Sequence, residues 1–287
     1  MNRPIPIKIV LTSLACAALA ASAQQTPAPF ITHQLKPNVY WIEGGGGNST
    51  VIIGAKGVIV VDAKTTNAGG QDLIAHIAKI TPKPVTTVIL THGDGDHVNG
   101  LAAFPEGIKI IAQQNNKKEQ QAALAAGGAG IPPADHLPTQ VVTKQKETMT
   151  IEGEKLELYH WAPAHTSGDL VVYLPAEKIV ATGDIVATNN PYPRIHDEKH
   201  GSPAGWITTA KGIVALDADT FIPGHGDIQT KADIQKRLAD SIARRDQVRK
   251  LAAQGKSLDE IKAAVGDNDK LPYKSWTEQC YMEFAKK

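Results

Sequence analysis

The sequence predicts one α/β domain with a helical extension at its C-terminal end. Short apolar runs bounded by glycine, typical of strands, alternate with segments of helical spacing in both halves of the chain. No linker rich in proline or serine divides the halves, and no short-period repeat occurs. At 287 residues, with 42% hydrophobic and 21% charged residues, the chain has the composition of a globular protein.

Residues 1–23 have the pattern of a cleaved signal peptide. Arg3 and Lys8 precede an apolar run from Ile9 to Ala21, and Ala23 closes a small-residue cleavage motif. The run is short for a membrane span, so we expect no stable membrane insertion after cleavage. Export would place the mature protein in the periplasm or outside the cell.

Cysteine content limits the kind of metal site that the mature chain can build. Loss of the leader removes Cys16 and leaves Cys280, which excludes an intramolecular disulfide and a zinc site with several thiolates. A lipoprotein anchor at Cys16 is a weaker alternative, because Ser13 stands where a leucine is expected. The formal charge is +1 before and −1 after cleavage. The small charge gives no strong field that would attract nucleic acid, so we expect no nucleic-acid partner. We also expect a small-molecule substrate, and the sequence is silent on the oligomeric state.

The first half alternates strands and helices after an N-terminal tether at residues 24–36. The apolar runs "VYWIE", "STVIIG" and "GVIVVDA" predict three strands, and "GGQDLIAHIAKI" has the spacing of a helix. "TTVILTH" predicts a buried strand, "GIKIIA" another, and "NNKKEQQAALAAGG" a helix that its glycines end. Residues 128–140 are expected to form a loop.

The second half predicts two hairpins, a helix, a strand and the extension. "ETMTIEGEKLELYHWA" and "DLVVYLPAEKIVATGD" have the pattern of hairpins, "SPAGWITTAKGIVAL" of a helix and "TFIPGHG" of a short strand. Residues 37–230 thus form the predicted main domain. Residues 231–287 form a helical extension packed on it, in which Ser257 is a good helix N-cap.

The segment "THGDGDHVNG" places His92, Asp94, Asp96 and His97 between a buried strand and a segment that could begin a helix. Ligands tend to bind at the carboxyl edge of such a sheet, and the intervening glycines let the chain bend so that alternate side chains converge. The alternative is a polar loop in which one aspartate caps the helix. That role would need no histidines at fixed offsets.

Three further candidates follow predicted strands elsewhere. His165 lies in "APAHTSGD", Asp184 in "VATGDIV" and His225 in "FIPGHGD". Each one alone is more often structural. Four glycine-rich strand ends that each carry a potential ligand are an improbable coincidence, so we expect them to form one metal site.

In the order and spacing of these motifs the sequence resembles the metallo-β-lactamase superfamily from about Val39 to His225. That family's first loop reads His-x-His-x-Asp-His, and later loops supply a histidine, a bridging aspartate and a final histidine. "GGGGNSTVIIGAKGVIVVDA" also looks like the family's opening hairpin. The resemblance implies a four-layer αβ/βα sandwich, with helices outside two β-sheets.

The resemblance also implies two divalent metal ions, which we expect to be zinc. His92, Asp94 and His165 would hold the first ion. Asp96, His97 and His225 would hold the second, and Asp184 would bridge the two.

Asp94 departs from the family pattern, which has histidine at this position. With two divalent ions, one hydroxide and three carboxylates the centre would be neutral, whereas a histidine here would leave one positive charge. A less positive centre lowers the pKa of water less, and a carboxylate suits iron or manganese better than imidazole does. Because aspartate is short, it could also reach the metal only through water. We therefore expect a normal second site and a weakened or altered first site.

An acidic residue at this position also resembles the di-iron branch of the family, which carries glutamate there. That branch also has a flavin domain, for which this chain has no room.

The implied mechanism is hydrolysis by metal-bound water, with Asp96 as the catalytic residue that orients the water or moves its proton. No Gly-x-Ser-x-Gly motif offers a competing nucleophile. We expect a carboxylic acid derivative as substrate, namely a β-lactam, a lactone or a thioester. Asp184, where many lactamases carry cysteine, favours the glyoxalase II-like branches, while export argues against a cytosolic thioesterase.

Two alternatives stay open at this point. One is a di-iron or persulfide-type redox enzyme of the same fold. The other is a non-catalytic metal-binding or interaction protein that docks through the segment after Lys231.

The loop "NNPYPRIHDEKHGS" gives a further hypothesis. Tyr192 and Arg194 are candidate substrate contacts, although a solvated surface loop explains them equally well. The same loop carries His196 and His200, and we interpret the loop as a possible rim of the substrate site.

Overall fold

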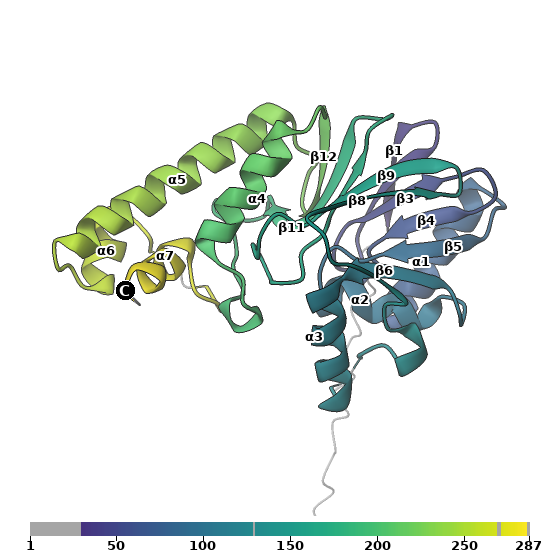
Figure 1. The fold of residues 1–287 in the computed structure, drawn as a ribbon, viewed down its shortest axis with the longest axis horizontal. Helices are drawn as coiled ribbons and strands as arrows, with labels where there is room; N and C mark the ends of the chain where they lie inside the picture. The colour runs from purple at the N-terminus through teal and green to yellow at the C-terminus, as the bar shows by residue number, and fades with distance from the viewer. Residues whose placement is uncertain (1–29, 129, 269–270, 286–287) are drawn as a thin grey trace, which may run out of the picture.

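The structure is a computed structural model that describes residues 30–128, 130–268 and 271–285. The predicted signal peptide, and the first part of the predicted tether at residues 24–29, lie outside the described residues. Within those residues, two β-sheets pack face to face with helices on both outer sides (Figure 1). This arrangement confirms the predicted sandwich.

The first sheet has seven strands in sequence order, antiparallel from β1 to β4 and parallel from β4 to β7. Its strands are β1 (Ile31–Lys36), β2 (Val39–Glu43), β3 (Ser49–Ile53), β4 (Val58–Val61), β5 (Val85–Ile89), β6 (Lys109–Gln113) and β7 (Gln140–Val142).

The second sheet has five strands in the order β12-β11-β10-β9-β8, all antiparallel except the pair β11 and β12. Its strands are β8 (Lys146–Ile151), β9 (Glu154–Tyr159), β10 (Val171–Leu174), β11 (Ile179–Ala187) and β12 (Thr220–His225). Both predicted hairpins, β8–β9 and β10–β11, are present.

The helices lie on the outer faces and in the extension. They are α1 (Asn67–Ile80), α2 (Gly95–Val98), α3 (Gln114–Ala125), α4 (Pro203–Ala215), α5 (Lys231–Ala253), α6 (Leu258–Val265) and α7 (Trp276–Ala285), with short 3₁₀ turns η1 (Asn99–Ala103), η2 (Ala134–His136) and η3 (Asp197–Lys199). No described helix combines the length and the apolar character needed to cross a bilayer.

Alternation along the strands builds the layers. In β4, Ile59 faces the cluster between the two sheets, whereas Val60 faces the cluster beneath α1. In β10, Val172 faces the inter-sheet cluster, whereas Val171 faces the cluster beneath α4 and α5. Successive side chains of a strand point to opposite faces, so each apolar strand is buried on both sides and is covered by helices outside.

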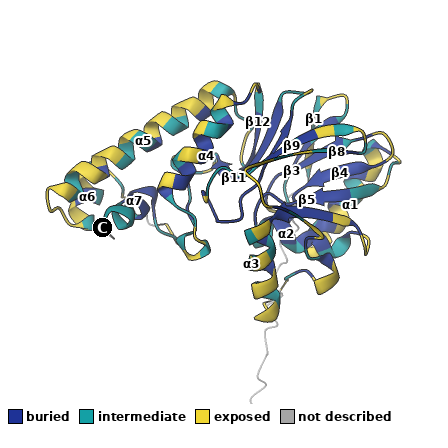
Figure 2. Cartoon of the chain, in the orientation of Figure 1, coloured by how far each residue is buried: buried dark blue, intermediate teal, exposed yellow. Residues whose placement is uncertain are grey.

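The extension packs on the outer side of the second sheet. Ile234 and Val248 of α5 share one buried cluster with Trp206 of α4 and Phe221 of β12. Beyond that contact α5 continues away from the sheets and is joined there by α6 and α7 (Figure 1). Its outer face is exposed along its length (Figure 2).

The prediction of a tether at residues 24–36 is wrong for residues 31–36, which form the edge strand β1. Its register pairs Ile31 with Glu43 and His33 with Trp41. The side chains of this strand are exposed or half-buried, so its sequence lacks a buried apolar pattern. Pairing with β2, and not burial, therefore defines the strand.

Candidate metal centre

The seven predicted ligands come from four segments that meet at one edge of the sandwich. His92 and Asp94 lie between β5 and α2, and Asp96 and His97 lie within the single turn of α2. The other three, His165, Asp184 and His225, come from the β9–β10 loop, from β11 and from the end of β12.

Asp184 lies inside β11 and not after its end, as the sequence had suggested. The pairing of β11 with β12 shifts register on both sides of Gly183, which has a positive φ of 54°. A Cβ atom at this glycine would lie 2.4 Å from Oγ1 of Thr91. A bulge at glycine therefore brings the strand against the β5 loop and aims the carboxylate of Asp184 into the site.

Three residues form what we call the second group: Asp96, His97 and His225. The Nε2 atoms of His97 and His225 lie 3.4 Å apart, and Oδ2 of Asp96 lies 2.9 Å from Nε2 of His225. Oδ1 of Asp184 lies 3.2 Å from Nε2 of His97, and its Oδ2 lies 3.4 Å from Nε2 of His225. These four side chains thus point their ligand atoms at a common space.

Three other residues form the first group: His92, Asp94 and His165. Oδ2 of Asp94 lies 3.7 Å from Nε2 of His92 and 3.3 Å from Nε2 of His165. Oδ2 of Asp184 lies 3.8 Å from Nε2 of His165. Asp184 therefore borders both groups, as a bridging ligand would.

These separations fit the edges of a coordination polyhedron. Ligand atoms placed about 2.0–2.1 Å from a tetrahedral metal ion are about 3.3 Å from one another. Most of the distances within the two groups lie close to that value. Nε2 of His92 and Oδ1 of Asp184 are also buried without a hydrogen-bond partner, which is costly unless a cation fills the site. The residues present therefore fit metal ions.

Hydrogen bonds at Nδ1 orient the imidazoles. Nδ1 of His97 lies 2.8 Å from Oδ2 of Asp62, and Nδ1 of His92 lies 2.9 Å from Oγ1 of Thr91. The Thr91 hydroxyl donates in turn to Asp62, and Nδ1 of His165 lies 2.9 Å from the carbonyl oxygen of Arg194. A proton on Nδ1 leaves the Nε2 lone pair free to face the site. Sequence reasoning missed Asp62, since no motif connects it to His97.

The electrostatics favour positive charge in the site. Burial opposes protonation of His165, but its hydrogen bond with Asp94 outweighs burial and raises the pKa of His165 to about 9. Burial likewise opposes protonation of His225, but its hydrogen bond with Asp184 outweighs burial and raises the pKa of His225 to about 9. Burial works against ionisation of Asp94, yet its hydrogen bond with His165 holds the pKa of that carboxyl well below its usual range. Buried carboxylates that hold protons on nearby imidazoles can hold a divalent cation instead, with release of those protons.

Asp94 has a cationic partner that the sequence did not predict. Nζ of Lys199, from η3, lies 2.5 Å from Oδ1 of Asp94. Lys199 therefore supplies a positive charge that balances the negative charge added by aspartate in place of a neutral histidine. His196, one residue before η3, also reaches this carboxylate, with its Nε2 atom 3.3 Å from Oδ2.

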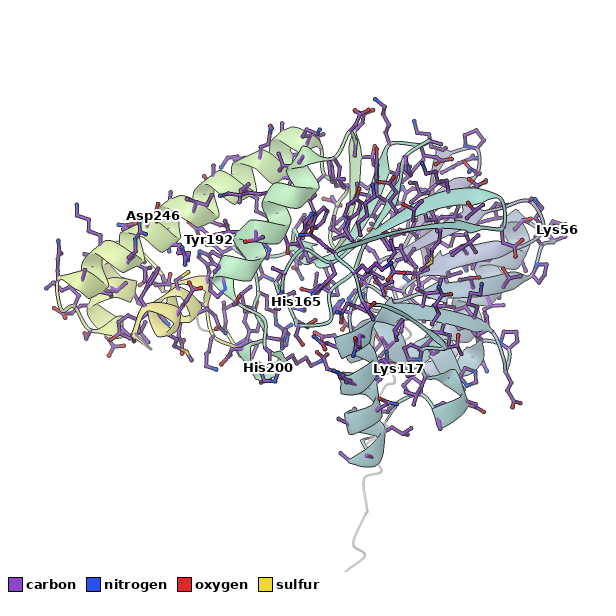
Figure 3. The ribbon with its side chains drawn as sticks, in the orientation of Figure 1. Lys56, Lys117, His165, Tyr192, His200 and Asp246 are labelled. Atoms are coloured by element: carbon purple, nitrogen blue, oxygen red, sulfur yellow. The ribbon has the colours of Figure 1, made fainter. Side chains whose placement is uncertain are left out.

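The predicted substrate contacts lie beside the extension. Arg244 of α5 is stacked over the ring of Tyr192, and Arg194 over the ring of Tyr273. Figure 3 shows Tyr192 beside α4 and α5, at a distance from His165. The structure thus places both side chains against the C-terminal segment and does not bring them among the metal ligands. Their role as substrate contacts stays a prediction.

Comparison with known proteins identifies the family to which the chain belongs. Residues 42–225 match the family model of the metallo-beta-lactamase superfamily. The chain belongs to this superfamily of hydrolases, as its motifs had suggested.

Individual relatives differ in what their names say they do. The chain is 28% identical to the alpha subunit of a 2,4-dinitroanisole O-demethylase from Nocardioides sp., over 68% of this chain and 57% of that protein. It is also 28% identical to a type 2 metallo-beta-lactamase from Bacillus sp., over 64% of this chain and 68% of that one. A sec-alkylsulfatase structure from Pseudomonas sp. matches with a TM-score of 0.67 and 18% identity, over 87% of this chain and 47% of that one. The chain thus spans about half the length of the demethylase subunit and of the sulfatase.

Proposed function

We propose that this protein is an exported hydrolase that uses two divalent metal ions, with zinc as the expected metal, against a carboxylic acid derivative. One observation carries the proposal: seven side chains from four separate segments converge with ligand atoms about 3–4 Å apart, and two of those atoms are buried without a partner. When bound, such ions supply the Lewis acidity that lowers the pKa of water from about 15.7 towards 7 and polarises an acyl oxygen.

Asp96 is the residue best placed to orient a water molecule. Its carboxylate is 36% exposed, whereas that of Asp184 is 6% exposed. Burial raises the pKa of Asp96, but the hydrogen bond with His225 outweighs it and lowers that pKa to about 2. At neutral pH this carboxylate is ionised, so it can accept a hydrogen bond from a water molecule and orient it.

Lys199 supports hydrolysis at the first group. A centre with three aspartates and two divalent ions loses the positive charge that a histidine at position 94 would leave. The ammonium of Lys199 on Asp94 compensates for that loss within the same site. We infer that the first group keeps its capacity to bind and activate, in place of the weakening that the sequence alone suggested.

A β-lactam, a lactone and a thioester are the expected acyl substrates. The names of the relatives add an alkyl sulfate ester and a nitroaryl methyl ether to the compounds worth assaying. Export, supported by the pattern of residues 1–23, and a small-molecule substrate remain part of the proposal.

Metal quantification with turnover assays tests the function. The purified chain is expected to hold about two zinc ions and to hydrolyse at least one acyl compound of the panel. Asp184→Asn should lower metal content and reduce turnover by at least about 100-fold, because it removes the shared ligand. Asp217→Asn is the control, since Asp217 is an exposed residue paired with Lys178.

Other outcomes would redirect the assignment. Iron as the dominant metal without hydrolysis would favour the redox alternative. A chain that binds no metal and turns over none of the compounds would contradict the proposal.

A further inference from the structure

We propose that His196 is a metal ligand of the first group, where it supplies the third imidazole that the motif lacks at position 94. The inference rests on the proposed function, because it assumes a metal ion between His92, Asp94 and His165. Neither the motif nor the ligand pattern of the superfamily pointed to His196, which lies outside the strand ends that carry the other ligands.

His196 lies beside the residues of the first group. Nε2 of His196 and Nε2 of His165 both lie 3.3 Å from Oδ2 of Asp94, and Nε2 of His92 lies 3.7 Å from it. The rings of His165 and His196 meet edge to face, with their centroids 4.7 Å apart. Each of the three nitrogens thus lies 3.3–3.7 Å from the same carboxylate oxygen, close to the length of one edge of a tetrahedral coordination polyhedron.

The hydrogen bonding of the His196 ring also suits a metal ligand. Nδ1 of His196 is bonded to Oε1 of Glu198, while its Nε2 is buried and has no hydrogen-bond partner. A carboxylate at Nδ1 holds the proton there, so the Nε2 lone pair faces the carboxylate of Asp94. Two buried electron-rich atoms that face each other are stabilised by a cation between them. This is the same arrangement that Asp62 creates at His97.

His136 and His200 do not combine a carboxylate at Nδ1 with a buried Nε2 atom that lacks a partner. His136 uses both nitrogens, one with Asp135 and one with the carbonyl of Phe104. His200 shares the loop with His196 but is exposed, and Figure 3 shows it at the lower end of that loop, away from His165.

Backbone hydrogen bonds hold His196 beside His165. Its amide donates to the carbonyl of His165 at 2.9 Å, and its carbonyl accepts from the amide of Gly201 at 2.9 Å. The main chain of one expected ligand therefore fixes the main chain of the proposed one. A ligand attached to a fixed backbone is oriented before the ion binds.

The donor set is consistent with zinc. Lys199 occupies Oδ1 of Asp94 and leaves Oδ2 for an ion. Three imidazole nitrogens and one carboxylate oxygen then complete a four-coordinate site, and Asp184 is available as a fifth ligand that reaches the second group.

Zinc stoichiometry and affinity of the full chain test the proposal, with inorganic zinc as the probe and chelator competition as the measurement. Wild type should bind two ions. His196→Ala should bind one ion as tightly as wild type and the other at least about 10-fold more weakly. His196→Gln retains much of the side-chain volume and should give the same result, while His200→Asn should leave both affinities unchanged.

Cobalt substitution gives a readout that does not depend on turnover. The visible d–d bands of the cobalt form report its coordination, and His196→Ala should alter the bands of one ion only. Retention of both zinc affinities in His196→Ala and His196→Gln would overturn the proposal and leave the proposed function standing. Loss of both ions from folded variants would also overturn it, whereas wild type without any bound zinc would instead contradict the proposed function.

Discussion

Lys64 is a single buried polar residue that supports the metal centre from below. Its side chain is fully buried, and its Nζ atom donates to the carbonyl oxygens of Ile42 and Gly47, both at 2.9 Å. Gly47 in turn lies against His97, because a Cβ atom there would be 2.3 Å from the ring. Lys64 therefore holds the glycine-rich turn that carries Gly47 against a metal-binding imidazole.

Titration of Lys64 gives a pH prediction. Burial lowers the pKa of Lys64 from 10.5 to about 7, although Asp62 opposes the shift. Between these values the unfolded chain holds a proton that the folded chain has released, so stability rises with pH. The slope approaches about 1.4 kcal/mol per pH unit. Urea unfolding of wild type and Lys64→Met from pH 6 to 10 should show this rise in wild type relative to the variant, and parallel curves would contradict it.

Sequence patterns located individual ligands well and their supporting residues poorly. His92, Asp94, Asp96 and His97 were visible because they occur together within one short motif. His196 and Lys199 carry no such local signal. They reach Asp94 only because the loop after β11 folds back onto the loop of His165, and that is a tertiary contact.

Hydrogen bonds hold the loop after β11 on two sides. On one side it bonds to the loop of His165. On the other side Lys274 donates to both oxygens of Asp197 at 2.8 Å, and Gln279 of α7 donates to the carbonyl of Ile195 at 3.1 Å. The segment around α7 thus holds the element that carries His196 and Lys199.

This bracing predicts an effect on metal binding from outside the centre. Gln279→Ala should weaken the affinity for one of the two ions by about 10-fold, because supporting hydrogen bonds keep ligands in place. Lys256→Ala, which removes an exposed ion pair with Glu260 on α6, should have no effect. Chelator competition measures both variants, and equal affinities in the two would show that α7 does not support the centre.

Elements with a strong apolar period were predicted, and those defined by pairing or packing were not. The run "GVIVVDA" gave β4 directly because it is buried on both faces. In β1 only pairing with β2 defines the strand. Residues 231–287 were expected to be helical, but no pattern marked the bounds of α7, whose Trp276 and Cys280 are buried by contact with the other C-terminal helices and α4.

The described residues form three buried hydrophobic clusters, and one of them depends on the extension. Ile234, Val248, Ile261 and Trp276, all after residue 230, are buried in the cluster that covers the outer side of the second sheet. Burial of such side chains contributes about 1.5–3 kcal/mol each. Their sum is comparable with the net stability of a domain, about 5–15 kcal/mol.

Truncation after Thr230 is therefore expected to abolish stable folding. It would expose Trp206 and Phe221, which the extension helps to bury in the full chain. Thermal unfolding and binding of a hydrophobic dye compare the truncated chain with the full chain. A soluble truncated form with the wild-type melting temperature would show instead that the extension is a dispensable docking segment.

The contact between Gln279 and the His196 loop has a reciprocal consequence. If holding the loop favours an ion, then the ion must favour the held loop by the same free energy. Occupancy of the centre would thus tighten α7 at the far C-terminal end of the described chain, and slower amide exchange there would report how full the centre is.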